Sequence, residues 1–85
     1  PLWENFCVIE RMKRNEYKRA FNNSYFWRTY EQTEIDYIEE RDGQLFAYEF
    51  KWGHSEPKMP KVFKEAYPHA EYQVISKTNF ISFIS

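Results

Sequence analysis

The stretch that decides the fold runs from Glu34 to Lys51 and reads EIDYIEERDGQLFAYEFK. It predicts two strands joined by a tight turn, because Asp42 and Gly43 both tolerate the positive φ angles of a type I′ hairpin loop. Counting outward from that loop gives a register that pairs Arg41 with Gln44, Ile38 with Ala47, Asp36 with Glu49 and Glu34 with Lys51.

This register makes two carboxylates, Asp36 and Glu49, cross-strand neighbours with Cβ atoms roughly 4.5–5.5 Å apart. Like charges that close repel each other, so a folded sheet needs something to compensate them. A divalent cation does so, and oxygen ligands suit Mg²⁺ or Mn²⁺. Lys51 points to the same face, which completes the outline of a phosphodiester-cleaving site. In the alternative interpretation, Glu34 pairs with Lys51 and both carboxylates are solvated on an exposed face.

The other face of the same hairpin is aromatic. Alternation along the two strands places one apolar set there, and such a surface must be buried under helices. The set is Ile35, Tyr37, Phe46, Tyr48, Phe50 and Trp52.

Composition describes one small domain with an aromatic-rich core: 85 residues, of which 21% are Phe, Trp or Tyr. The net charge of −1 gives no overall basic field, so a nucleic acid partner must be met by a local patch. The single cysteine, Cys7, excludes an internal disulfide and a cysteine-rich zinc site. No apolar run approaches the roughly 20 residues that span a bilayer. We therefore expect a cytoplasmic domain without a membrane partner and, since the chain starts at Pro1, a piece of a longer protein.

Residues 2 to about 21 predict an amphipathic helix. Its apolar stripe consists of Leu2, Trp3, Phe6, Cys7, Ile9, Tyr17, Ala20 and Phe21, and Arg11 falls outside it. Glu10 projects from the middle of the stripe, whereas Glu4 points away near the helix start. Both acids have a structural interpretation. Glu10 can form an ion pair with a basic side chain, and Glu4 can be a favourable charge at the helix start. Each is also a candidate to complete a metal shell.

The remaining elements follow in chain order. Residues 25–30 predict an inner or covered strand, and Pro60 begins a short helix that ends at about Tyr67. That helix is expected to turn Val62, Phe63, Ala66 and Tyr67 inward. Residues 72–75 and 80–84 predict two strands, the first parallel to its neighbour after a crossover. The expected fold is an α/β sandwich with a small mixed sheet: helix, antiparallel three-strand meander, crossover helix, then one or two strands.

The whole chain also resembles a known family. The segments that carry the resemblance, in order, are WENFCVIERMK, YFWRT, EIDYIEERDGQLFAYEFKW and a helix ending in YP. They resemble the C-terminal PD-(D/E)XK nuclease-like domain of uncharacterised bacterial and archaeal AAA-type ATPases. The resemblance implies a restriction-endonuclease-like fold over residues 1–85. It also implies an ATPase domain elsewhere in the parent chain, because no G-x-x-x-x-G-K-[ST] motif occurs here.

By resemblance, Asp36 corresponds to the Asp of the motif, and Glu49 and Lys51 correspond to its (D/E)-x-K. Glu4 matches the acid of the first helix, whereas the periodicity of the helix favours Glu10; both remain candidates. Ile35 stands where the strict motif has proline. The implied activity is Mg²⁺- or Mn²⁺-dependent hydrolysis of DNA.

Two further interpretations stay open. In one, the domain is a non-catalytic DNA- or protein-binding module that regulates the ATPase. In the other, it is a structural or dimerising domain whose acid pair is neutralised by the basic surface of a partner. This interpretation includes a homodimer that forms through uncovered strands.

Overall fold

A computed structural model describes residues 2–20, 22–29, 33–53 and 56–85. Its elements in chain order are α1 (Leu2–Tyr17), β1 (Asn23–Arg28), β2 (Glu34–Arg41), β3 (Gln44–Phe50), α2 (Lys61–Ala66), β4 (Glu71–Ile75) and α3 (Phe80–Ile84). The strands form one sheet in the order β1-β2-β3-β4. The first three strands are antiparallel to their neighbours and β4 runs parallel to β3, as predicted. This confirms an α/β fold with a small mixed sheet.

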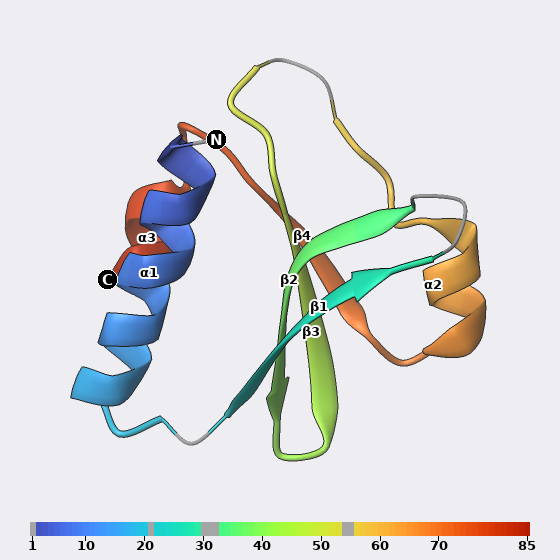
Figure 1. The fold of residues 1–85 in the computed structure, drawn as a ribbon, viewed down its shortest axis with the longest axis horizontal. Coiled ribbons are helices and arrows are strands. Elements are labelled where there is room, and N and C mark those ends of the chain that lie inside the picture. The colour runs from blue at the N-terminus through green and yellow to red at the C-terminus, as the bar shows by residue number, and fades with distance from the viewer. Residues whose placement is uncertain (1, 21, 30–32, 54–55) are drawn as a thin grey trace.

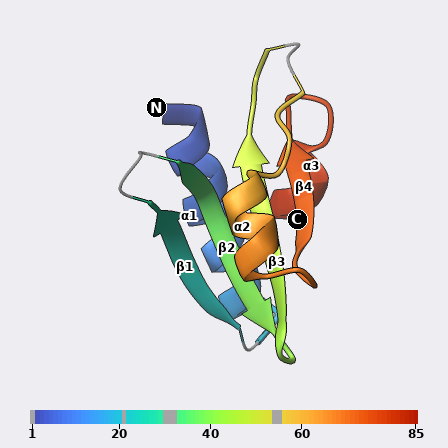
Figure 2. The same cartoon turned by 90° about the vertical axis from the view of Figure 1, so that its right-hand side faces the viewer.

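The helices form two layers, one on each side of the sheet. Figure 1 shows α1 and α3 together on one side and α2 on the other, and Figure 2 shows α2 in front of the strands with α1 and α3 behind. No helix in the described part of the chain is long and apolar enough to cross a membrane.

The hairpin turn forms as the sequence predicts. Asp42 and Gly43 both have positive φ angles, 52° and 79°, which is the signature of a type I′ loop. The strand register outward from the turn matches the expectation from Arg41–Gln44 through Ile38–Ala47 to Tyr37–Tyr48. The described pairing of β2 with β3 ends at Tyr37–Tyr48, short of the expected Asp36–Glu49 and Glu34–Lys51 pairs.

A β-bulge in β2 lies at the point where the pairing of β2 with β3 ends. On the β1 side, Tyr25 pairs with Ile38 and Trp27 pairs with Ile35. One residue of β1 therefore lies opposite two residues of β2, Asp36 and Tyr37. A bulge of this kind shifts the alternation of side chains by one residue. The bulge corrects the prediction that Ile35 shares a face with Tyr37, because Ile35 packs on the α2 side.

The aromatic face of the hairpin is buried under α1 and α3, as predicted. The core on that side contains buried residues from both helices and from β2, β3 and β4: Cys7, Tyr37, Tyr48, Phe50, Ile75 and Phe83. Phe83 is its centre, with ring centroids 4.9 Å from Tyr48 and 5.6 Å from Phe50. Trp52, expected in this face, is half exposed at its edge.

The second core lies under α2 and is smaller. Its buried members are Ile35, Ile38, Ala47 and Phe63. Of the four α2 residues expected to point inward, only Phe63 is fully buried, whereas Val62, Ala66 and Tyr67 are exposed. A helix of six residues presents little more than one turn to the sheet, which leaves room for one large inward side chain.

Glu39 holds the first core together as a fully buried carboxylate, with 0% of its surface exposed. Arg11 on α1 donates two hydrogen bonds to it, from Nε at 2.9 Å and from Nη2 at 3.0 Å. Asn15 donates a third at 2.8 Å, the Tyr37 hydroxyl a fourth at 3.0 Å, and Arg41 forms an ion pair with it. The Arg11 and Asn15 hydrogen bonds together lower the pKa of the Glu39 carboxyl despite its burial. The carboxylate is thus ionised and fully satisfied.

Arg11 therefore faces inward, which corrects its predicted place outside the buried stripe. Its Nη1 also donates to the carbonyl of Phe83 at 2.8 Å, and its guanidinium lies over the Phe83 ring. The buried residues of α1 are Cys7, Arg11 and Asn15, at four-residue spacing, and Trp3 and Val8 pack against the core beside them. As a consequence, several apolar residues of the predicted stripe are exposed: Leu2, Phe6, Ile9 and Tyr17.

The helix α1 ends at Tyr17, four residues before the predicted end. Arg19 has a positive φ of 54°, and the N–H groups of Arg19 and Ala20 bond to the carbonyls of Glu16 and Asn15. This pair of bonds is a Schellman cap. Phe21, Tyr30 and His54, which the sequence analysis placed in a helix, a strand and a loop, lie outside the described residues.

Two predicted elements differ from the structure. Residues 80–84 form a helix rather than a strand, since the Asn79 side chain bonds the Ser76 N–H and the Val74 carbonyl and so closes a turn that starts α3. A short apolar run cannot be assigned by periodicity alone. The strand β1 is a largely exposed edge strand rather than an inner one, because β2 is its only partner among the described strands and its outward aromatics are uncovered.

Replacing Glu39 with Gln tests the buried network. The variant leaves two guanidinium groups, Arg11 and Arg41, without their anion, so we expect a loss of about 3–5 kcal/mol in the free energy of unfolding. Urea denaturation at neutral pH measures it. The matched control is Glu10→Gln, which removes only an exposed pair with Lys13 and should change stability by less than about 0.5 kcal/mol. Equal midpoints for the two variants would contradict the role of Glu39.

Candidate carboxylate site at the bulge

The structure brings Asp36 and Glu49 together beside the bulge. Asp36 Oδ2 accepts a hydrogen bond from the backbone N–H of Phe50 at 2.9 Å. The Glu49 carboxyl in turn bonds both the side chain and the backbone of Asp36. The two side chains therefore bridge β2 and β3 beyond the point where the described backbone pairing ends. A β-bulge commonly re-aims a side chain in this way next to a functional site.

The carboxyl pair shares a proton at neutral pH. Burial is the largest cause that raises the pKa of Glu49, to about 8, and the hydrogen bond and negative charge of Asp36 add to it. Ionising Glu49 would place a second negative charge against Asp36, so Glu49 keeps its proton at neutral pH unless a cation compensates that charge. The pair thus holds a proton that a bound cation would displace.

Tyr72 on β4 adds an unpartnered donor to this site. It pairs with Ala47 in the parallel ladder, so its side chain lies diagonal to Glu49 on the α2 side of the sheet. Its hydroxyl oxygen is buried and has no hydrogen-bond partner. Burial and the charges of Glu49 and Asp36 raise the pKa of this hydroxyl to about 12. A buried donor beside two carboxyls that leaves its hydrogen bond unmade is expected to serve a ligand or a water.

The two acids of α1 are placed differently. The charge of Glu4 contributes to the raised pKa of Glu49, which puts it within electrostatic range of the pair. Glu10 instead accepts a hydrogen bond from Lys13 at 3.2 Å. The structure therefore favours Glu4 over Glu10 as the helix acid whose charge reaches the site.

Lys51 follows two residues after Glu49, where β3 leaves the sheet. Its backbone N–H donates to the carbonyl of Ile75 at 2.8 Å, which fixes the main chain at this point. Its side chain is exposed and forms no ion pair with a described residue. The alternative interpretation, in which Lys51 pairs with Glu34, is not borne out, because Glu34 pairs with Arg28. Lys51 is thus an uncompensated cation close in sequence to the carboxyl pair.

The donor set fits a magnesium-like ion that keeps most of its waters. Among the described residues, no group of three or more His, Cys, Asp or Glu side chains is arranged to hold a metal. Mg²⁺ commonly binds through one or two carboxylates and takes its remaining ligands from water and substrate oxygens. Asp36 and Glu49 supply those two carboxylates, and the unpartnered Tyr72 hydroxyl supplies a donor for a water or an anion beside them.

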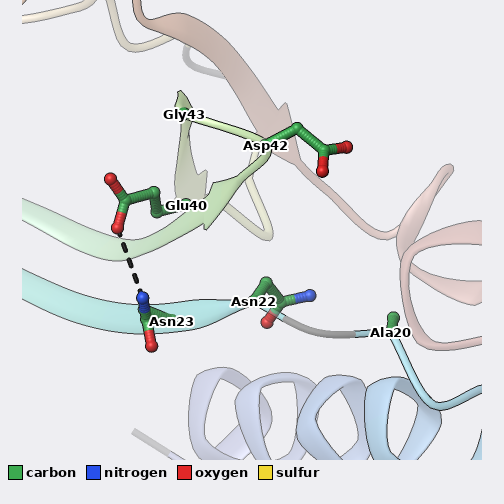
Figure 3. Close-up of a pocket in the computed structure, with 6 residues that line it drawn as sticks. All are labelled: Ala20, Asn22, Asn23, Glu40, Asp42 and Gly43. Carbon is green, nitrogen blue, oxygen red and sulfur yellow. Dashed lines mark hydrogen bonds between the residues drawn. The ribbon is translucent and has the colours of Figure 1, made fainter.

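A separate polar pocket of about 460 Å³ lies at the turn end of the hairpin (Figure 3). The Glu40 carboxylate in it accepts hydrogen bonds from Asn23 at 3.3 Å and from the Tyr25 hydroxyl at 3.1 Å. The Asp42 side chain points away from Glu40 in Figure 3, so the two acids do not converge. None of the site residues predicted from the sequence lines this pocket.

The fold and the site define a small α/β domain with a paired-carboxylate centre on its sheet. Residues 1–83 match a family described as a domain of unknown function, DUF4143, and because the match spans nearly the whole chain, the chain belongs to this family. A search of curated proteins and a search of solved structures returned no significant match.

Sequence patterns alone do not single out two residues of this structure, Tyr72 beside the carboxyl pair and Glu39 in the core. Nothing in the sequence places Tyr72 diagonal to Glu49 until the parallel pairing of β3 with β4 is known. Glu39 follows Tyr37 by two residues on the aromatic face of β2, and that alternation was a usable signal for a buried acid.

The shared proton makes stability depend on pH in the absence of metal. The pKa of Glu49 is about 8 in the folded protein against an ordinary value of 4.5, so the folded state binds an extra proton between these values. The contribution of this proton to stability is full below about pH 4.5 and is lost as the pH rises to about 8. We expect the free energy of unfolding in EDTA to fall over this range, by at most about 1.4 kcal/mol per pH unit.

Urea denaturation at several pH values measures this slope. Glu49→Gln replaces the carboxyl by a permanently neutral amide and should flatten the slope. Glu71→Gln, an exposed acid on β4, should keep the wild-type slope. A Glu49→Gln slope equal to that of wild type would show that the proton is not held at this pair.

Proposed function

We propose that this domain hydrolyses DNA phosphodiester bonds with a divalent cation held by Asp36 and Glu49. The observation that carries the proposal is the carboxyl pair itself. Two acids share one proton beside a β-bulge, next to an unpartnered Tyr72 hydroxyl and two residues before an uncompensated lysine. The order Asp, then Glu-x-Lys on the adjacent strand, is that of the PD-(D/E)XK motif, which the sequence resembles.

The roles of the residues follow from their chemistry. Mg²⁺ or Mn²⁺, when bound, polarises the phosphate and lowers the pKa of an attacking water. Asp36 and Glu49 act as its carboxylate ligands once their shared proton has left, and Glu4 adds negative charge from α1. The ammonium of Lys51 orients the attacking water or offsets charge on the phosphate.

Family membership is compatible with a place at the C-terminal end of an AAA-type ATPase, and we include that place in the proposal. The ATPase domain of the parent chain is then the first protein partner, and the cytoplasm is the compartment. These statements rest on the sequence resemblance, and the carboxyl site does not depend on them.

A second candidate function is a non-catalytic binding module of the same ATPase. The observation that favours it is the outer face of α1, which leaves Leu2, Phe6, Ile9 and Met12 exposed. Exposed apolar patches of this kind mark protein interaction sites when they are contiguous. The near-neutral net charge points the same way, because it supplies no general attraction for nucleic acid.

Calorimetric titration with Mg²⁺ and Mn²⁺ tests the metal site directly. We expect saturable binding by wild type that weakens at least about tenfold in Asp36→Asn and Glu49→Gln, since each removes one anionic ligand of the ion. The Asn side chain can still accept the Phe50 N–H, so Asp36→Asn tests charge rather than the fold. No binding at millimolar metal would make the site untenable.

Cleavage assays then test the chemistry. Lys51→Met should lower the rate of DNA hydrolysis at least about 100-fold, because it removes a charge that acts on the transition state. The matched control is Lys64→Met, an exposed lysine on α2 that should leave the rate unchanged. Metal binding without any cleavage by wild type would favour the binding-module alternative.

A further inference from the structure

A groove of about 340 Å³ lies where β3 and β4 end side by side. We name it the strand-end groove, and its main lining residues are Lys51, Trp52, Val74, Ser76, Lys77 and Thr78. The two strands run in the same direction here, as Figure 2 shows. In open α/β sheets, ligands bind outside the carboxyl ends of parallel strands. One lining residue, Val74, is the direct partner of Glu49 in the parallel ladder, which connects the groove to the carboxyl pair.

The groove carries an excess of positive charge. Lys51 and Lys77 are both exposed, and neither forms an ion pair with a described residue. One acid, Glu56, also lines the groove, so two cations face one anion and the local net charge is +1, against −1 for the whole chain. Lysine side chains of this kind bind phosphates as point charges. The charge therefore selects an anionic ligand.

Trp52 gives the groove an aromatic surface. Its ring is 53% exposed, yet two other rings fix its position. Trp3 packs edge-on against it at 5.1 Å between centroids, and Phe80 lies tilted at 6.3 Å. A half-exposed indole that the core holds in place loses little freedom when a flat ligand stacks on it. Beside two lysines, this is the pattern by which proteins bind the unpaired bases and phosphates of single strands.

We propose that the strand-end groove binds single-stranded nucleic acid, with phosphates on Lys51 and Lys77 and one base stacked on Trp52. The inference deepens the proposed phosphodiesterase function and rests on it for the statement that the bound strand is the substrate. A base within a duplex does not offer its face to a side chain, so the groove discriminates against double-stranded DNA. The domain would then act on single strands, frayed ends or displaced strands.

Fluorescence anisotropy with a labelled oligo(dT) of about 15 nucleotides, in EDTA, tests binding apart from cleavage. We expect wild type to bind the single strand at least about tenfold more tightly than a duplex of equal length. Lys77→Glu should weaken single-strand binding at least about tenfold and reduce its dependence on salt, because one phosphate contact is lost. Lys64→Glu carries the same change of net charge at an exposed site on α2 and should change affinity less than about twofold.

The stacking contact has its own variant. Trp52→Leu should weaken single-strand binding between about 5-fold and 100-fold and leave duplex binding unchanged. The urea denaturation midpoint of Trp52→Leu shows whether this variant is still folded. Trp52→Phe keeps an aromatic ring and should recover part of the affinity for the single strand. No saturable binding of the oligonucleotide by wild type, equal losses in Lys77→Glu and Lys64→Glu, or full affinity in Trp52→Leu would each overturn the proposal.

Different experimental results would refute the proposed binding groove and the proposed phosphodiesterase function. Single-strand binding in EDTA without metal-dependent cleavage would support the groove and refute the phosphodiesterase function. Conversely, cleavage could depend on Asp36 and Glu49 while Lys77→Glu and Trp52→Leu have the same KM as wild type. That result would support the phosphodiesterase function and overturn the proposal that the groove binds the substrate.

Discussion

The buried ion pair between Glu39 and Arg11 is the interaction on which the arrangement of the helices depends. A carboxylate with no exposed surface is tolerated only when charge and hydrogen bonds satisfy it fully, and Asn15, Tyr37 and Arg41 complete that shell. Because Arg11 also bonds the Phe83 carbonyl, one side chain fixes α1 against the sheet and α3 against α1. The requirement for a cation at this position sets the rotation of α1, which is why its outer face keeps exposed apolar residues that could otherwise have been buried.

The bulge in β2 connects this core to the candidate site. It allows Tyr37 and Glu39 to face α1 while Ile35 and Ile38 face α2, so a single strand supplies both cores of a small sheet. The same irregularity ends the regular pairing of β2 with β3 at Tyr37–Tyr48. Beyond that point, the two strands are joined through side chains: Asp36 accepts the Phe50 N–H, and Glu49 bonds the side chain and backbone of Asp36. The acids are thus held next to each other by the backbone, which is the preorganisation that a metal centre needs.

Local rules predicted much of this structure. The Asp42-Gly43 turn gave the correct register because both residues adopt positive φ, and the register placed Asp36 near Glu49. The parallel direction of β4 followed from the crossover. The wrong predictions concern side chains whose direction depends on tertiary contacts. Ile35 faces α2 because of a bulge that has no sequence signal, and Arg11 faces the core because it pairs with Glu39, 28 residues away. Residues 80–84 became a helix because a side chain, Asn79, closes a turn before them. The metal role of the acids and the nuclease-like fold remain predictions.

The central claim is that Asp36 and Glu49 bind one divalent cation. Crystals grown above pH 8 and soaked in Mn²⁺ test it most directly, since anomalous scattering locates the ion independently of any assay. We predict one strong peak between the two carboxylates, within coordination distance of an oxygen of each, with the hydrogen bond between Asp36 and Glu49 broken. An intact hydrogen bond between Asp36 and Glu49, with manganese absent or bound elsewhere, would contradict the account.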